Sequence, residues 1–200
     1  MERGRGGPAL ARDDERRALL IERLRPGRRL WDLPDGKATE IAAGLLEQLW
    51  IRADRPFRRL ENMAARWVEE LPTRGLDRKL VDRAVTFLPE AGPTQRESVL
   101  LHQDFHGANV LDSARGWLAI DPKPLVGERE FDTASLLRDR RWELRNDPGA
   151  AARVRRRLDR LSADLGLDRD RMRGWGIAHA LAWGSGEDDM VACARWLAAA

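Results

Sequence analysis

Three short apolar runs, at residues 99–101, 109–111 and 117–120, interrupt a chain whose other apolar residues recur at helical spacing. The residues SARG at 113–116 separate the last two runs, as a hairpin turn would. Helical periodicity predicts helices near 37–50, 58–71 and 75–88 before the runs, and near 132–143, 148–165, 169–184 and 189–199 after them. A short strand is expected at 17–24, then a loop over 25–36 in which Asp35 caps the next helix. This order predicts an α+β fold dominated by helix.

The composition is that of a globular chain, with 42% hydrophobic and 34% charged residues among 200. No apolar run approaches the length that spans a bilayer, and no apolar signal segment follows the basic N-terminus, so a cytoplasmic protein without a membrane partner is expected. Acidic residues are interleaved with the arginines, which favours solvated helix faces over a nucleic-acid surface. The single cysteine, Cys193, excludes an internal disulfide and is expected to be a small buried hydrophobe rather than a nucleophile.

Four polar residues in and after the apolar runs carry a chemical pattern. His102, Asp104 and Asn109 have the spacing of a kinase catalytic loop, and Asp121 ends the next apolar run. A carboxylate can aim a hydroxyl and take its proton, which makes Asp104 the candidate base. An amide and a carboxylate suit Mg²⁺ beside phosphates, so Asn109 and Asp121 are candidate ligands, while His102 would hold the loop. Turn formation is the ordinary alternative for Asp and Asn beside strands, but the combined spacing favours catalysis.

Two segments give the chain a family resemblance. Residues 102–111, HQDFHGANVL, and residues 117–132, WLAIDPKPLVGEREFD, closely resemble the aminoglycoside phosphotransferases, in the branch of the streptomycin 6-kinases and hydroxyurea-resistance kinases. The resemblance implies a protein-kinase-like fold, with residues 1–30 as a remnant of the small lobe and hinge and residues 31–200 as the helical large lobe. It also implies ATP-dependent phosphorylation of an alcohol group of a streptomycin-like antibiotic, conferring resistance.

The same resemblance assigns roles along the chain. It implies that Asp104 is the base, that Asn109 and Asp121 bind Mg²⁺, and that Asp132 is a buried brace for the catalytic loop, supported by His102. Backbone groups near the end of the first strand would meet the adenine of ATP; these residues are Ile21, Glu22, Arg23 and Leu24. The C-terminal region would form the wall of the small-molecule site. The acceptor hydroxyl and the oligomeric state are not predicted.

The sequence also departs from the family pattern. The family has a glycine-rich phosphate loop and an ATP-binding lysine upstream of the hinge strand, whereas only about sixteen residues without a lysine precede that strand here. We therefore expect a truncated chain, natural or from a misplaced start codon, with impaired activity. The alternative is an inactive kinase-like fragment that at most binds a ligand or a partner. Gln103 also stands where the family usually has Gly, and Ala108 separates Gly107 from Asn109.

Acidic side chains near the C-terminus suit a polycationic sugar, because Coulomb attraction would concentrate it there. The candidates for this substrate contact are the cluster Glu187, Asp188 and Asp189, together with Glu128 and Glu130, which lie near the Mg²⁺ motif in the sequence. Trp183 is a residue that could stack on a sugar ring. An ordinary acidic helix start explains residues 187–189 equally well. A place in the core is the alternative for Trp183.

Overall fold

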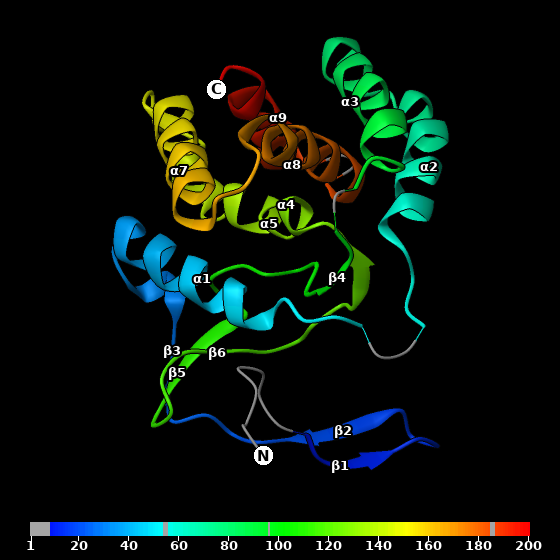
Figure 1. Ribbon diagram of the computed structural model, residues 1–200. Helices are drawn as coiled ribbons and strands as arrows, with labels where there is room; N and C mark the ends of the chain where they lie inside the picture. Colours follow the sequence, from blue (N-terminus) through cyan, green and yellow to red (C-terminus); the bar gives the residue numbers. More distant parts are fainter. Residues whose placement is uncertain (1–8, 54–55, 96, 185–186) are drawn as a thin grey trace.

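The computed structural model describes residues 9–53, 56–95, 97–184 and 187–200, and helices dominate it (Figure 1). Its N-terminal part holds β1 (Ala9–Asp13), β2 (Ala18–Ile21), β3 (Pro26–Arg29), η1 (Leu30–Asp32) and α1 (Asp35–Leu49). There follow α2 (Leu60–Glu70), η2 (Leu71–Thr73), α3 (Arg78–Ala91), β4 (Val99–Leu101), β5 (Val110–Ser113), β6 (Leu118–Ala119) and β7 (Leu125–Gly127). The chain continues with α4 (Arg129–Asp132), α5 (Ala134–Leu137), α6 (Arg141–Leu144), α7 (Ala150–Leu165), α8 (Arg169–Trp183) and α9 (Asp188–Ala198).

The strands form small antiparallel sheets in the described part of the chain. β1 pairs with β2, β3–β5–β6 form a second sheet, and β4 pairs with β7. The β1–β2 hairpin lies at one end of the molecule, and the helices α3, α7, α8 and α9 lie at the other (Figure 1). The β3–β5–β6 sheet and α1 stand between them, so this sheet connects the two ends.

The core of the helical part is built around α8. Almost all of its last two turns are buried, because α8 packs against α3, α5 and α9 on different sides. Trp175 of α8 meets Phe87 of α3 and Phe131 of α4 edge to face, with ring centroids 5.3 Å apart in each pair. A Cβ at Gly174 would lie 2.5 Å from the Phe87 ring, so glycine allows the close approach of α3 and α8.

Most of the predicted helices are confirmed within a few residues, but three expectations about local structure were wrong. The helix expected at 132–143 is three single turns, α4, α5 and α6. Thr133 separates α4 from α5, and Arg140, with a left-handed φ of 57°, lies between α5 and α6. The segment 25–36, expected to be a loop, contains strand β3 and the 3-10 helix η1. The sequence of β3, Pro-Gly-Arg-Arg, has no apolar alternation that would predict a strand. Asp35 is the first residue of α1 and accepts a hydrogen bond from Arg157 at 2.6 Å instead of capping the helix.

Two further expectations concern burial and membrane spans. Cys193 is fully buried in α9, as expected for a small hydrophobe, and its burial raises the pKa of the thiol to about 12. Within the described ranges, none of the helices combines the length and the apolar character needed to cross a lipid bilayer.

Candidate active site

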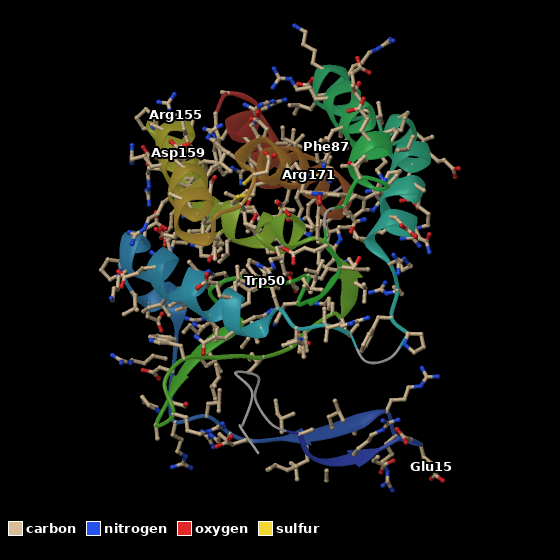
Figure 2. All side chains as sticks on the ribbon, in the orientation of Figure 1. Glu15, Trp50, Phe87, Arg155, Asp159 and Arg171 are labelled. Atoms are coloured by element: carbon tan, nitrogen blue, oxygen red, sulfur yellow. The ribbon has the colours of Figure 1, made fainter. Side chains whose placement is uncertain are left out.

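The loop of residues 102–109 carries the candidate base Asp104 and is called the catalytic loop below. It connects β4 to β5 and is held by the buried carboxylate of Asp132. Asp132 Oδ2 accepts hydrogen bonds from His102 N and Trp50 Nε1, each at 3.0 Å, and Oδ1 accepts from Gln103 N at 2.6 Å. Trp50 lies near the centre of the molecule (Figure 2). Complete burial raises the pKa of Asp132, while the three N–H donors oppose that shift. The brace implied by the sequence therefore has a physical form: one acceptor group that fixes two successive peptide units of the loop.

The first residues of the loop are constrained from several other sides. His102 Nε2 lies 3.0 Å from the carbonyl oxygen of Ile120, which ties the loop to the end of β6. Burial lowers the pKa of His102, in keeping with a neutral ring that supports the loop. Gln103 adopts a left-handed φ of 70°. Its carbonyl accepts from Ser135 Oγ at 3.1 Å and its side-chain oxygen from Arg58 at 3.3 Å, so local contacts hold a conformation that usually favours glycine.

Asp104 presents its carboxylate at the edge of the buried region, with 11% of the side chain exposed. Arg138 Nη2 donates to Oδ1 at 3.2 Å, Lys123 Nζ donates to Oδ2, and His106 Nε2 lies 3.6 Å from Oδ1. Burial by itself would raise the pKa of Asp104, but the hydrogen bond from Lys123 and the nearby positive charges outweigh it and lower the pKa. The group is thus kept as a carboxylate, the form that accepts a proton.

Asn109 and Asp121 are brought together by the β5–β6 hairpin. Ile120 N donates to Asn109 O at 2.9 Å, which sets Asp121 one residue beyond that pairing. Asn109 Nδ2 donates to the backbone carbonyl of Asp104 at 3.0 Å, so its Oδ1 is the atom suited to a metal. Asp121 adopts a left-handed φ of 55° and has an exposed carboxylate. One amide oxygen and one carboxylate fit Mg²⁺ shared with phosphates.

The described residues contain no cluster of three or more His, Cys, Asp or Glu side chains that could enclose a metal. A magnesium ion at Asn109 and Asp121 would therefore depend on ligand oxygens from a phosphate or water for the rest of its coordination. This agrees with the general behaviour of Mg²⁺ at phosphoryl-transfer sites, where the ion keeps several non-protein ligands.

A cleft of about 690 Å³ opens beside this hairpin. One wall is the segment 21–27, which includes all four residues predicted to lie near adenine, and the other includes Leu111 and Ile120 of the hairpin. The volume is in the range of ligand sites, which run from about 300 to 1,000 Å³. Since Ile120 directly precedes Asp121, a nucleotide with its base in the cleft would have the candidate metal site close by.

Comparison with known proteins gives the family. The model of the aminoglycoside/hydroxyurea antibiotic resistance kinases matches residues 2–189. The chain belongs to this family. A streptomycin 6-kinase from Streptomyces griseus is 37% identical over 194 residues, a match that covers 88% of this chain and 61% of that enzyme. The chain thus spans about three fifths of the length of that relative.

Solved structures give the fold. A choline kinase from Streptococcus pneumoniae superposes with a TM-score of 0.65 at 11% identity, over 98% of this chain and 75% of the other. An aminoglycoside phosphotransferase solved with ADP and hygromycin B has a TM-score of 0.58 at 15% identity, over 90% of this chain and 70% of the other. The protein-kinase-like fold, its α+β class and the family resemblance drawn from the sequence are confirmed.

In this kinase-family chain, the acidic residues suggested for substrate contact form two groups, one at the start of α4 and one at the start of α9. Glu128 is buried, accepts from both Arg171 Nε and Nη2 and also binds Trp175 Nε1. Figure 2 places Arg171 among the helices at the α8 end of the molecule. Burial raises the pKa of Glu128 despite these donors. Its contacts join the start of α4 to α8, and Glu130 is also buried, so both belong to the helical packing.

The second acidic group, residues 187–189, lies at the start of α9 and faces two arginines. Arg141 lies 3.3 Å from Glu187 and 3.7 Å from Asp189, and Arg145 lies 3.4 Å from Asp188 and 3.6 Å from Asp189. A polycationic ligand would have to compete with both guanidinium groups for these carboxylates. In the structure, the carboxylates of residues 187–189 therefore have arginine partners from α6 and the residue that follows it.

Trp183 is the suggested substrate residue that the structure does bring near the catalytic loop. Lys123 Nζ lies 5.9 Å and the Arg138 guanidinium 6.0 Å from the centre of its indole ring, and both cations also contact Asp104. Its ring stacks on His179 with centroids 4.8 Å apart. With 37% of its surface exposed, Trp183 forms a partly open aromatic wall beside the site.

Sequence reasoning missed two cations of the site, Lys123 and Arg138. Lys123 stands between two prolines in the segment that carries the resemblance, so its position two residues after Asp121 could have identified it as a site residue. Arg138 lies in the arginine-rich run 138–141, where nothing in the sequence distinguishes it from a surface residue. Arg138 is buried in the segment between α5 and α6, a break in the helix that the periodicity did not reveal.

Proposed function

We propose that this site transfers the γ-phosphoryl group of ATP to a hydroxyl of a streptomycin-like aminoglycoside, with Mg²⁺ as cofactor, and that the modification confers resistance. The observation that carries the proposal is the ionised, nearly buried carboxylate of Asp104 beside the Asn109–Asp121 hairpin. Membership of the kinase family and the named streptomycin 6-kinase relative support the choice of acceptor.

The proposed chemistry assigns one task to each group. The nucleotide lies between the large lobe and the small-lobe remnant expected over residues 1–30, of which residues 1–8 lie outside the described part of the chain. Its base occupies the cleft lined by residues 21–24. Asn109 and Asp121 would hold Mg²⁺, which neutralises phosphate charge when bound. The acceptor oxygen bonds to the γ-phosphorus, the bond from that phosphorus to the β,γ-bridging oxygen breaks, and ADP leaves. Asp104 aims the hydroxyl and takes its proton.

Replacing Asp104 by Asn tests the proposal directly. The change keeps the shape of the side chain but removes the proton acceptor, so streptomycin-dependent transfer from labelled ATP should fall by roughly 10²–10⁴-fold. Both chains comprise residues 1–200, and the comparison requires that the original chain transfers phosphate above the rate measured without enzyme. Circular dichroism and denaturant unfolding should show that Asp104→Asn remains folded.

Asp164→Asn is the matched control, since Asp164 forms an exposed pair with Arg160 at 3.1 Å on α7. It should leave the transfer rate unchanged. Equal rates for the original chain and Asp104→Asn, or an equal loss in Asp164→Asn, would contradict the assignment of Asp104 as base.

A further inference from the structure

Lys123 is a cation of the site to which no role has yet been given. It lies between Pro122 and Pro124 in the turn that follows β6, and its backbone N–H donates to His102 O at 2.9 Å. The two rings restrict the backbone, and the hydrogen bond joins the turn to the first residue of the catalytic loop. The backbone of Lys123, from which the side chain extends, is therefore held in place relative to the loop that carries Asp104.

The ammonium group of Lys123 lies in the gap between the two key carboxylates. It donates to Asp104 Oδ2 and lies 3.6 Å from Asp121 Oδ2. Asp104 is the proposed proton acceptor and Asp121 a proposed metal ligand. A phosphoryl group passing from nucleotide to acceptor has to travel through the space that these two side chains border, and Lys123 reaches into that space.

Comparison with Arg138 shows that Lys123 is poorly explained as a structural counter-ion alone. Arg138 is buried, occupies the other oxygen of Asp104 at 3.2 Å and also bonds Ser135. It can compensate the charge of Asp104 from within the protein. Lys123 has 42% of its side chain exposed and a flexible stem, so it can exchange partners when an anion enters.

We propose that Lys123 binds the transferred phosphoryl group of the nucleotide, an inference that rests on the proposed function. When the γ-phosphate lies near Asp104, its negative charge offers the ammonium group a second partner, and positive charge bound at Asp121 would weaken the contact of the ammonium with that carboxylate. Lysine binds phosphate as a compact point charge with several donors. Lys123 stays protonated throughout, and the hydroxyl proton still goes to Asp104.

The lysine content of the chain makes a direct measurement possible. Its three lysines are Lys37, Lys79 and Lys123. Labelling lysine with ¹³C at Cε should give three NMR signals, which Lys37→Arg and Lys79→Arg assign. Mg²⁺ with ATP should shift the Lys123 signal, Mg²⁺ with ADP should shift it much less, and the other two signals should stay in place. The method detects weak binding and requires no turnover.

Lys123→Met gives the second measurement, because methionine keeps much of the stem and removes the charge. The affinity for ATP should fall by about 10-fold to 100-fold, as expected for a lost hydrogen bond to a charged group, and the affinity for ADP should not change. Lys37→Met is the matched control. Lys37 pairs with Glu40 on the surface of α1 at 2.7 Å, and its loss should alter neither affinity.

The outcomes separate the two proposals. A second sample labelled with ¹⁵N gives the amide signals of the chain. If ATP shifts the amide signals of residues 21–24 but leaves the Lys123 signal in place, or if Lys123→Met lowers the ATP and ADP affinities equally, the phosphate role of Lys123 is overturned while nucleotide binding stands. If neither nucleotide shifts any signal of the chain, the proposed function fails, and the role of Lys123 fails with it.

Discussion

The catalytic loop at 102–109 and the acidic segment at 187–189 both place carboxylates beside arginines, but in opposite surroundings. Asp104 and Arg138 lie 3.2 Å apart with side chains 11% and 10% exposed. Asp188 and Arg145 lie 3.4 Å apart with side chains 88% and 54% exposed. Water screens the second pair and hardly reaches the first, so nearly equal distances correspond to very different interactions.

The two regions also differ in what fixes them. The catalytic loop is held through Asp132, whose oxygens accept three hydrogen bonds from buried donors. Residues 188 and 189 form the first turn of α9, where carboxylates are favoured by the helix dipole. The first region is specified by buried polar contacts that admit one arrangement. In the second region, the helix start accounts for the acidic residues without a ligand. Their side chains can contact either solvent or the two arginines.

The largest effect is expected from Asp132→Asn. The amide would turn an N–H group towards at least one of the donors from Trp50, His102 or Gln103, leaving a buried donor without an acceptor. Each such loss costs about 1–3 kcal/mol, and we expect the free energy of unfolding to fall by roughly 2–4 kcal/mol. Urea unfolding followed by circular dichroism measures this. A change below about 0.5 kcal/mol, the usual size for a surface substitution, would show that Asp132 does not hold the loop.

A smaller, pH-dependent effect is expected from His179, which lies in the buried region beneath Trp183. The ring is fully buried among Trp67, Phe131 and Trp183, and neither ring nitrogen has a hydrogen-bond partner among the described residues. Burial, reinforced by the charge of Arg138, lowers the pKa of His179 well below 6.5. The folded chain therefore keeps this ring neutral at a pH where the unfolded chain protonates it.

The consequence is a loss of stability as pH falls below about 6.5, since protons then bind preferentially to the unfolded chain. Each pH unit below that value should cost about 1.4 kcal/mol through this one group. His179→Phe should remove that slope, because phenylalanine fills a similar space without titrating. Unfolding free energies at pH 7, 6 and 5 give the difference between the two chains, in which the contributions of His102 and His106 cancel. Parallel curves would contradict the assignment.

The same contrast explains how much could be predicted from the sequence. The proximity of Asp104, Asn109 and Asp121 could be predicted because the spacing of a loop and a hairpin is local, so residues a few positions apart stay close in space. Long helices such as α7 and α8 were found for a similar reason, since their periodicity is continuous over four turns. Both predictions needed only the spacing of residues that are close in the sequence.

What could not be predicted depends on contacts between distant segments. Arg138 reaches Asp104 across 34 residues, and the pairing of Glu128 with Arg171 spans 43. Glu128 looks like a surface acid in the sequence, and only the packing of α4 against α8 buries it. Strand β3 is specified by its pairing with β5 rather than by apolar residues, which is why its Pro-Gly-Arg-Arg sequence suggested a loop.

The smallest effect is expected from Asp188→Asn, which repeats the Asp132→Asn change in the exposed region. The substitution removes the charge that faces Arg145 at 3.4 Å, but the carboxylate is 88% exposed and the arginine also lies 3.6 Å from Asp189. Exposed pairs contribute little because water and salt screen them and because both side chains lose freedom on pairing. We expect the free energy of unfolding to change by less than about 0.5 kcal/mol, and by still less at high salt. Urea unfolding of Asp188→Asn and Asp132→Asn in one buffer, at low and high salt, gives the matched comparison. A loss in Asp188→Asn as large as that in Asp132→Asn would show that burial does not separate the two regions.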